Sequence, residues 1–345
     1  MKAKIYRGLL LSILLLMLSS CHSSKKELHI YSWSDYIKPS LIEEFEKQFD
    51  CKVILDTFDS NEAMYAKLKA GATGYDLIFP SSYFVELMHK QGLLQKIDSD
   101  LIPNLKYVDL SYPIPGGDKA LQLAVPYMVS YAGIGYRKDK VQDLYPSWEV
   151  FARTDLRGRM TMLNDVREAV GAALKSLGYS LNTIDDIQIS AATSTLIKWK
   201  RNLAKFESEQ YKNGIASAEY LVVQGYNGDL IQVMQEDEKV GLLYPQEGTS
   251  ISIDEMVIPK HAEEVELAHH LINFLLEPKH AAENMEFIFF VSPNTGAYEF
   301  LSTKIKSNPA FFLPNEIRQR SEVIRDLSEN NILYIQAWET VKEAQ

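Results

Sequence analysis

The feature that most constrains the fold is the alternation, from Leu28 to Met88, of short apolar runs with segments of helical periodicity. This alternation is typical of βαβ units, which build a parallel sheet covered by helices. The predicted strands are 28–31, 52–58 and 75–79, and the predicted helices begin near Pro39, at a cap on Asp59, and after Ser82. This part of the chain is therefore predicted to be an α/β unit.

A second unit of the same kind begins at Met160. Residues 160–163 are a predicted strand, and a predicted helix runs through Leu174 toward Gly178. The chain has 345 residues with 46% apolar content, which is more than one hydrophobic core usually holds. We therefore expect two α/β domains.

Residues 1–20 are predicted to be a signal peptide. Three basic residues, Lys2, Lys4 and Arg7, precede an apolar run at 8–17 that is too short to span a bilayer. The small residues before Cys21 resemble the bacterial lipobox, which implies cleavage there, acylation of the thiol, and a lipidated tether at 21–27. The expected location is the periplasm or the cell surface, anchored to a bacterial membrane at Cys21; the alternative is that Cys21 ends an uncleaved anchor.

The rest of the composition argues against a nucleic-acid partner, an internal disulfide and a metal site. The net charge of −10 becomes about −13 without the signal, which disfavours nucleic acid as a partner. Cys51 is then the last cysteine, so no internal disulfide is possible, and we interpret it as a buried apolar side chain. The histidines in and beside the later helical stretches have no acid placed to complete a metal set. We predict no metal, no cofactor and a monomer.

Two loops of the first unit carry an unusual density of aromatic and hydrogen-bonding groups. In open α/β sheets ligands bind beyond the carboxyl ends of the strands, and the loops at 32–36 and 80–83 lie at such ends. The candidate side chains in them are Trp33, Asp35, Tyr36, Ser81 and Tyr83. Each also has a plain structural interpretation, as a helix cap, a first-turn acid or a packing residue.

The second half adds acids at similar positions. Asp165 and Glu168 open the helix after the strand at 160–163, where the first is equally suited to be an N-cap and the second a first-turn acid. Tyr226 and Asp229 follow another apolar run. Asp254 stands in a segment that looks like a crossover back to the first domain.

Carboxylates on both sides of a cleft walled by aromatic rings suit an aliphatic polyamine. Its ammonium groups need charge-assisted hydrogen bonds, and its methylene stem needs flat apolar walls, with cation–π attraction adding about 0.5–2 kcal/mol per contact. A buried cation without an acid would cost far more than these contacts return. A sugar would use the aromatic faces but would not need so many acids.

The chain resembles the spermidine/putrescine-binding proteins of bacterial polyamine ABC transporters over almost the whole mature sequence. The matching stretches, in order, are 31–36, 58–62, 75–81, 126–128, 133–136, 165–168 and 244–248. The resemblance implies an α/β, two-lobe periplasmic-binding-protein fold of class II, with a mostly parallel sheet in each lobe and the ligand in the interlobe cleft. One lobe would comprise 28–134 and 249–312, and the other 135–248 and 313–345.

The resemblance also implies roles for individual residues. Trp33 and Tyr36 would form an aromatic wall, Ser34 and Asp35 would bond an amine, and Ser81 and Tyr83 would line the same lobe. Asp165 and Glu168 would supply carboxylates from the second lobe, and Asp254 would grip an amine. Tyr226 would replace a tryptophan of the family, and Asp229 matches an acid of putrescine binders. The implied function is a solute-binding lipoprotein that captures putrescine or spermidine for an ABC permease.

Three departures leave the preferred polyamine open. Ser252 stands where many members have an aromatic residue, Phe290 stands where a tyrosine is common, and the late glutamine of the family has no counterpart in 324–331. Three other functions stay open at this point. They are binding of another small cationic solute, an enzyme using Asp165 and Glu168 as acid and base, and a surface adhesin or sensor with a vestigial cleft.

Overall fold

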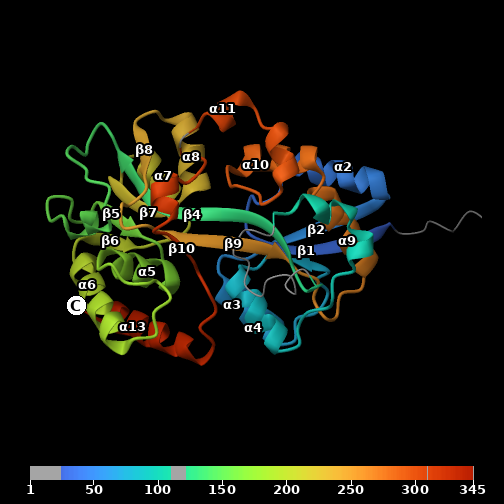
Figure 1. The fold of residues 1–345 in the computed structure, drawn as a ribbon, viewed down its shortest axis with the longest axis horizontal. Coiled ribbons are helices and arrows are strands. Elements are labelled where there is room, and N and C mark those ends of the chain that lie inside the picture. Colours follow the sequence, from blue (N-terminus) through green and yellow to red (C-terminus); the bar gives the residue numbers. More distant parts are fainter. Residues whose placement is uncertain (1–24, 110–121, 309, 345) are drawn as a thin grey trace, which may run out of the picture.

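A computed structural model describes residues 25–109, 122–308 and 310–344. The predicted signal peptide and the lipidation site at Cys21 lie outside the described residues. Figure 1 shows two α/β lobes side by side, joined by two long strands that cross the middle of the molecule. This arrangement confirms the predicted fold class.

The first lobe is built on a parallel sheet of order β2-β1-β3. Its central strand carries Leu28 and Ile30, both fully buried, because alternate side chains of a strand point to one face. The predicted strands and helices of this lobe are confirmed, with α3 capped by Ser60 rather than Asp59. Its elements are β1 (Lys26–Ser32), α2 (Pro39–Phe49), β2 (Cys51–Thr57), α3 (Asn61–Lys69), β3 (Leu77–Ile78), α4 (Ser82–Lys90), α9 (Val265–Leu275), α10 (Pro278–Ile288) and α11 (Thr303–Lys306).

The second lobe contains a mixed sheet. Strands β6, β5 and β7 are parallel neighbours, whereas the crossing strand β4 (Val125–Arg137) runs antiparallel to β7 and β8. The prediction of a mostly parallel sheet therefore holds for β6, β5 and β7 and is wrong for β4 and its neighbours β7 and β8, which pair antiparallel. Its elements are β5 (Met160–Met162), α5 (Val166–Ser176), α6 (Asp186–Lys200), β6 (Leu203–Phe206), α7 (Tyr211–Ala216), β7 (Val222–Tyr226), α8 (Asn227–Glu236), β8 (Val240–Leu243) and α13 (Asn331–Glu343). Between the lobes, α12 (Asn315–Arg318) is followed by β10 (Glu322–Val323), which pairs with the connecting strand β9.

Two antiparallel strands, β4 and β9 (Ser250–Met256), connect the lobes. The first half of β4 pairs with β9, and from Ala132 onward β4 pairs with β7 and β8. The change of partner lies close to the predicted boundary at 134/135, which stays a prediction along with those at 248/249 and 312/313. Because both strands are shared, a movement of one lobe relative to the other must be absorbed in them.

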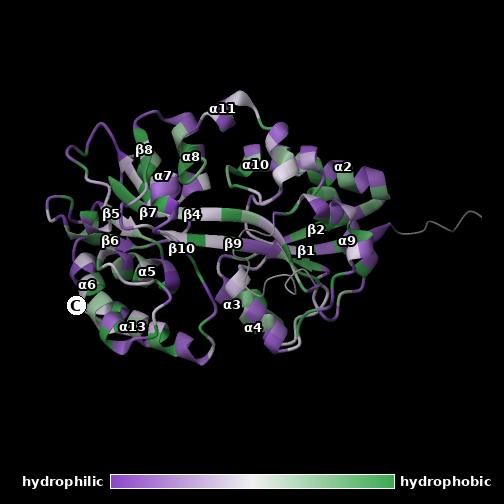
Figure 2. Ribbon diagram, viewed as in Figure 1, coloured by the Kyte–Doolittle hydropathy of each residue, from purple (hydrophilic) through white to green (hydrophobic). Residues whose placement is uncertain are grey.

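Each lobe has a hydrophobic core, and that of the first lobe extends to Ile231 and Tyr244 of the second. The core of the first lobe packs Phe45, Phe79 and Phe311 beside the central sheet, and Cys51 is buried there as an unpaired thiol. The core of the second lobe contains Trp148 and Trp199, covered by α13. Figure 2 shows polar residues on the outer sides of the helices and apolar residues toward the sheets.

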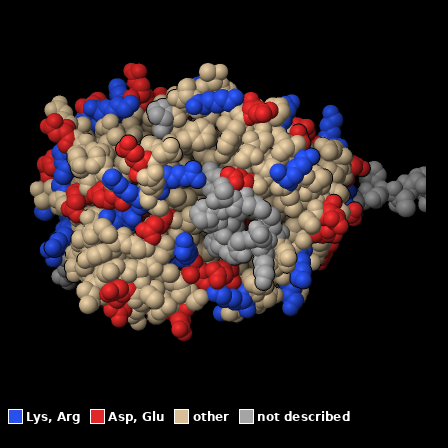
Figure 3. Space-filling view, viewed as in Figure 1, with Lys and Arg blue, Asp and Glu red and all other residues tan. Residues whose placement is uncertain are grey.

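The surface shows no strong separation of charge. On the face drawn in Figure 3, acidic and basic side chains are interspersed. Among the described residues, no helix combines the length and apolar character needed to cross a bilayer.

Candidate functional site

Asp254 on β9 is the centre of a buried hydrogen-bonded cluster. The Tyr36 hydroxyl donates to its Oδ2 at 2.5 Å, and the Ser81 hydroxyl donates to its Oδ1 at 2.6 Å. Only 8% of Asp254 is exposed, and this burial raises the pKa of its carboxyl to about 6, although both hydroxyl groups favour the charged form. Three residues predicted from separate parts of the sequence thus meet at one point.

The backbone fixes this meeting. The segment after β3 pairs antiparallel with β9, and this pairing sets Ser81 directly opposite Asp254. Asn61, at the start of α3, accepts a hydrogen bond from the Ser81 backbone N–H at 3.0 Å and donates to the Ser81 and Tyr83 hydroxyls at 3.1 and 3.3 Å. Asn61 was not among the site residues predicted from the sequence. Its position directly after the helix cap at Ser60 was the one local feature that could have drawn attention to it.

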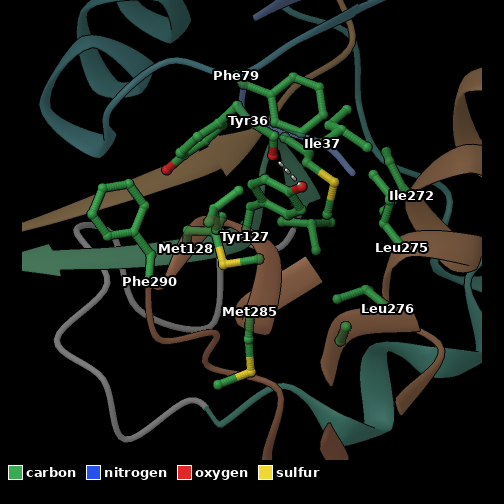
Figure 4. Close-up of a cluster of buried hydrophobic side chains, with 14 of the residues drawn as sticks. Tyr36, Ile37, Phe79, Tyr127, Met128, Ile272, Leu275, Leu276, Met285 and Phe290 are labelled. Atoms are coloured by element: carbon green, nitrogen blue, oxygen red, sulfur yellow. Dashed lines mark hydrogen bonds between the residues drawn. The ribbon is translucent and has the colours of Figure 1, made fainter. Parts of the chain in front are cut away.

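Tyr36 is held as part of the hydrophobic core of the first lobe. Its ring makes edge contacts with Tyr127 and Phe290, and its carbonyl oxygen accepts a hydrogen bond from the Tyr127 hydroxyl at 3.0 Å. Figure 4 shows the Tyr36 hydroxyl pointing away from this apolar cluster. Burial, with the adjacent Asp254 charge, raises the pKa of the phenol well above its ordinary value, so Tyr36 acts as a donor.

Glu168 brings a second buried carboxylate from the second lobe. Its Oε2 accepts from the Ser250 hydroxyl at 2.5 Å, and its Oε1 lies 3.4 Å from the Ser252 hydroxyl. Ser250, Ser252 and Asp254 alternate along β9 and therefore share one face of it. Burial, reinforced by the charge of Asp165, raises the pKa of Glu168 to about 8. Ser252, which the sequence analysis treated as a lost aromatic wall, therefore also faces Glu168.

Asp165 has the structural role that was weighed for it, because it caps α5. Its carboxylate accepts the backbone N–H groups of Arg167 and Glu168 at 2.8 and 3.0 Å. The residue is still partly exposed to the cleft. Burial raises the pKa of Asp165 despite these two hydrogen bonds.

Tyr226 and Asp229 occupy the start of α8 with different surroundings. Tyr226 is half-buried, and burial together with the nearby charges of Glu168 and Asp165 raises its pKa well above the ordinary value. Asp229 accepts a hydrogen bond from Tyr211 and forms an ion pair with Lys212 at 3.3 Å. The role of Asp229 as an amine ligand stays a prediction. Lys212 already pairs with the carboxylate that an amine would have to bind.

The loop after β1 that carries Tyr36 also carries Trp33, Ser34 and Asp35. Trp33 is half-buried and packs against Phe58, with ring centroids 4.4 Å apart. Ser34 and Asp35 are exposed, and Asp35 has a left-handed backbone with φ of 53°. Their contacts with a ligand stay predictions.

A cleft of about 750 Å³ lies between the lobes, and Asp254, Glu168 and Tyr36 are not among the residues that line it. Tyr83 lines it from α4, and Asp165 lines it from the start of α5. We call this space the outer cleft. Its further lining residues include Glu62, Tyr65, Phe84, Glu207, Tyr334 and Trp338.

Two lobes around a cleft, with one buried carboxylate on the connecting strand β9 and another on α5 of the second lobe, define a ligand-binding protein of the two-lobe class. The chain belongs to the family described as bacterial extracellular solute-binding protein, whose model matches residues 40–313. Proteins of this family bind solutes rather than transform them.

Several proteins to which the chain is similar are named for polyamines. The chain is 32% identical to the spermidine/putrescine-binding periplasmic protein of Salmonella typhimurium over 95% of both chains, and 31% identical to the putrescine-binding periplasmic protein PotF of Escherichia coli over 86% of both. A solved structure described as a spermidine/putrescine ABC transporter of Listeria monocytogenes matches with a TM-score of 0.87 and 33% identity, over 93% of this chain and 100% of that one. A lipoprotein of Treponema pallidum, Tp0655 or TpPotD, matches with a TM-score of 0.83 and 34% identity, over 92% and 99%.

The contact between Gly228 and Phe290 gives a test of how closely the lobes must approach. A Cβ on Gly228 would lie 2.5 Å from Phe290 Cδ1 and 2.6 Å from the Ile288 carbonyl oxygen. Because Gly228 belongs to α8 and the other two residues lie at and beyond the end of α10, Gly228→Ala must push these elements apart. We expect ligand affinity to fall at least about tenfold while the protein stays folded.

The matched control is Gly171→Ala in the middle of α5. Its added Cβ would have only an ordinary contact, 3.5 Å from the Leu181 Cβ, and alanine favours a helix. Calorimetric titration and circular dichroism of both variants check the expectation. Equal affinities for the two variants would contradict it.

Proposed function

We propose that this protein captures a polyamine, putrescine or spermidine, in its interlobe cleft and delivers it to an ABC permease. The observation that carries the proposal is the pair of buried carboxylates on Asp254 and Glu168. Each is held by hydroxyl donors, and neither forms an ion pair with a described lysine, arginine or histidine. Buried acids held only by neutral donors retain acceptor capacity for ammonium groups.

The walls of the site support an aliphatic cation. Tyr36 donates to Asp254, the Tyr83 hydroxyl shares Asn61 with Ser81, and the charges of Glu168 and Asp165 contribute to the raised pKa of Tyr226. Trp33 lies in the same loop as Tyr36. Flat apolar faces pack against methylene groups, while the ring faces attract cations. The polyamine names of the relatives agree with this chemistry.

Delivery follows from the difference between the open and closed arrangements of the lobes. A ligand that contacts Asp254 and Glu168 together binds the closed form more tightly and so increases its population. The permease would then recognise the closed form. We further propose that the mature protein is a monomer, held at a bacterial membrane in the periplasm or at the cell surface by lipid on Cys21.

Isothermal titration of the mature chain, prepared without residues 1–21 and freed of ligand by unfolding and refolding, tests the proposal. We expect tight one-to-one binding of putrescine or spermidine, with cadaverine as the comparison diamine. Absence of heat with all three from a folded sample would refute polyamine binding and favour another small cationic solute.

A further inference from the structure

Helix α4 of the first lobe packs against the second lobe along one side of the outer cleft. Tyr83 and Phe84, which are 9% and 7% exposed, form a small hydrophobic cluster with Leu181 and Ile324. Leu181 lies between α5 and α6, and its carbonyl oxygen accepts a hydrogen bond from the Tyr334 hydroxyl of α13 at 2.9 Å. The cluster therefore joins the two lobes.

The segment that carries Ile324 is held on the second lobe by hydrogen bonds. The Asn182 side chain donates to the Val323 carbonyl oxygen at 2.9 Å and accepts the Arg325 backbone N–H at 3.0 Å. The Arg167 guanidinium donates to the Arg325 carbonyl oxygen at 2.7 Å. Figure 1 shows this segment, which follows β10, running between α4 and α13. A movement of α4 away from the second lobe must therefore break its contact with Ile324.

An ion pair extends the same contact. Lys90, in the last turn of α4, lies 3.0 Å from Asp326 Oδ2 and donates to the Ser328 hydroxyl at 2.9 Å. The Asp326 side chain is 1% exposed, and its Oδ1 accepts a hydrogen bond from the side-chain amide of Asn331, the first residue of α13, at 2.7 Å. Lys90 also pairs with Glu86 of its own helix at 3.0 Å. A buried acid of the second lobe is thus matched by a cation of the first.

We propose that these contacts form a clasp, which stabilises the closed arrangement of the lobes through protein groups alone and raises the affinity for every ligand by the same factor. The α4 clasp comprises Tyr83, Phe84 and Lys90 of α4 together with Leu181, Ile324 and Asp326.

The physical basis is the free-energy difference between the open and closed forms. Apolar burial and the ion pair of the α4 clasp are both lost when the lobes separate, so each favours the closed form. The apparent affinity of a ligand that binds the closed form scales with the fraction of protein that is closed. The effect on affinity rests on the proposed function, whereas the α4 clasp itself does not depend on which solute is bound.

Lys90→Gln tests the ion pair, because Lys90 is not among the residues that line the outer cleft. We expect putrescine and spermidine to bind about threefold more weakly, by the same factor, and to dissociate faster. Calorimetric titration and stopped-flow dissociation measure these changes. Lys47→Gln is the matched control and should change neither quantity, since Lys47 is an exposed lysine in the last turn of α2 in the same lobe.

Two further variants test the rest of the α4 clasp. Phe84→Ala removes the aromatic contact with the second lobe, and we expect it to weaken both ligands by about tenfold. In an Asp326→Asn background the effect of Lys90→Gln should largely disappear, because the ion pair is already broken. Circular dichroism checks that each variant is folded.

The separation of the lobes can also be measured without added ligand. A variant with Lys69→Cys on α3 and Glu339→Cys on α13 carries spin labels at two exposed positions, and Cys51 is buried. The two helices line the outer cleft from different lobes. We expect the ratio of the longer to the shorter label distance to increase about threefold in Lys90→Gln and to stay constant in Lys47→Gln.

Two results would overturn the α4 clasp. One is an unequal loss of putrescine and spermidine binding in Lys90→Gln, and the other is the same distribution of label distances in Lys90→Gln as in the unmodified protein. Failure of both polyamines to bind, with the label distances shifted as expected, would instead overturn the proposed function and support the α4 clasp.

Discussion

Asp254→Asn is expected to weaken polyamine binding by at least about 30-fold, the lower end of the roughly 2–5 kcal/mol lost when one partner of a buried, hydrogen-bonded charge pair is removed. The Tyr36 and Ser81 hydroxyls now point at carboxylate oxygens, at 2.5 and 2.6 Å. An amide offers one acceptor in place of two and presents an N–H group to the ligand cation. Calorimetric titration with putrescine and spermidine measures the loss.

Glu255→Gln is the control for this variant. Glu255 is the next residue of β9 and is equally buried, but its side chain points to the opposite face of the strand. Burial raises the pKa of Glu255 to about 8, so it is largely uncharged at neutral pH and glutamine imitates it closely. Unchanged affinity in Asp254→Asn, or an equal loss in both variants, would show that Asp254 does not grip the ligand.

Polyamine binding is also expected to weaken by roughly a hundredfold as the pH falls from about 8.5 to about 6. In the ligand-free protein the pKa of Glu168 is raised to about 8 and that of Asp254 to about 6, in both cases mainly by burial. Primary ammonium groups stay charged throughout this range, since that of lysine has a pKa near 10.4. A bound cation must therefore displace protons from these carboxyls, and the displacement becomes harder at lower pH.

The stability of the ligand-free protein should change in the opposite direction. A carboxyl whose pKa is raised by folding stabilises the folded state fully below its unfolded pKa, and this contribution is lost as the pH rises through the folded pKa. For Glu168 the window runs from the ordinary value of 4.5 to about 8. The melting temperature of the free protein should therefore fall across this window more steeply than that of Glu168→Gln.

Titrations in two buffers of different ionisation enthalpy count the protons released on binding. We expect release of close to one proton near pH 7, and its loss in Glu168→Gln, which also binds more weakly at every pH. An affinity that stays constant between pH 6 and 8.5 would contradict the assignment of Glu168 as a ligand of the amine.

Local sequence patterns predicted most of the secondary structure. The alternation of apolar runs gave β1, β2 and β5 within a few residues, and the acid before α5 was recognised as a possible cap. The cap of α3 was placed one residue early. Ser60, with extended backbone angles, accepts the Ala63 N–H at 3.2 Å, whereas Asp59 lies outside the helix.

The site was predicted less completely, because its contacts join distant residues. Asp254 was singled out as an acid in a crossover segment, and the family resemblance then gave it a role. No local pattern links it to Tyr36, which is 218 residues away, or to Ser81, which is 173 residues away. Asn61 and Ser250 were missed for the same reason. Each looks like an ordinary polar residue until its neighbours from other elements are known.

The sequence by itself determined the α/β elements and the kind of ligand, because apolar periodicity and the supply of acids and aromatic rings are local properties. The two-lobe class came from the resemblance to a known family. Only the tertiary structure decided which acids act together. The pairing of β9 with the segment after β3 sets Asp254 opposite Ser81, and the packing of the second lobe brings Glu168 against Ser250. Strand register and lobe packing are determined by the sum of many contacts between distant segments, and no single stretch of sequence contains that information.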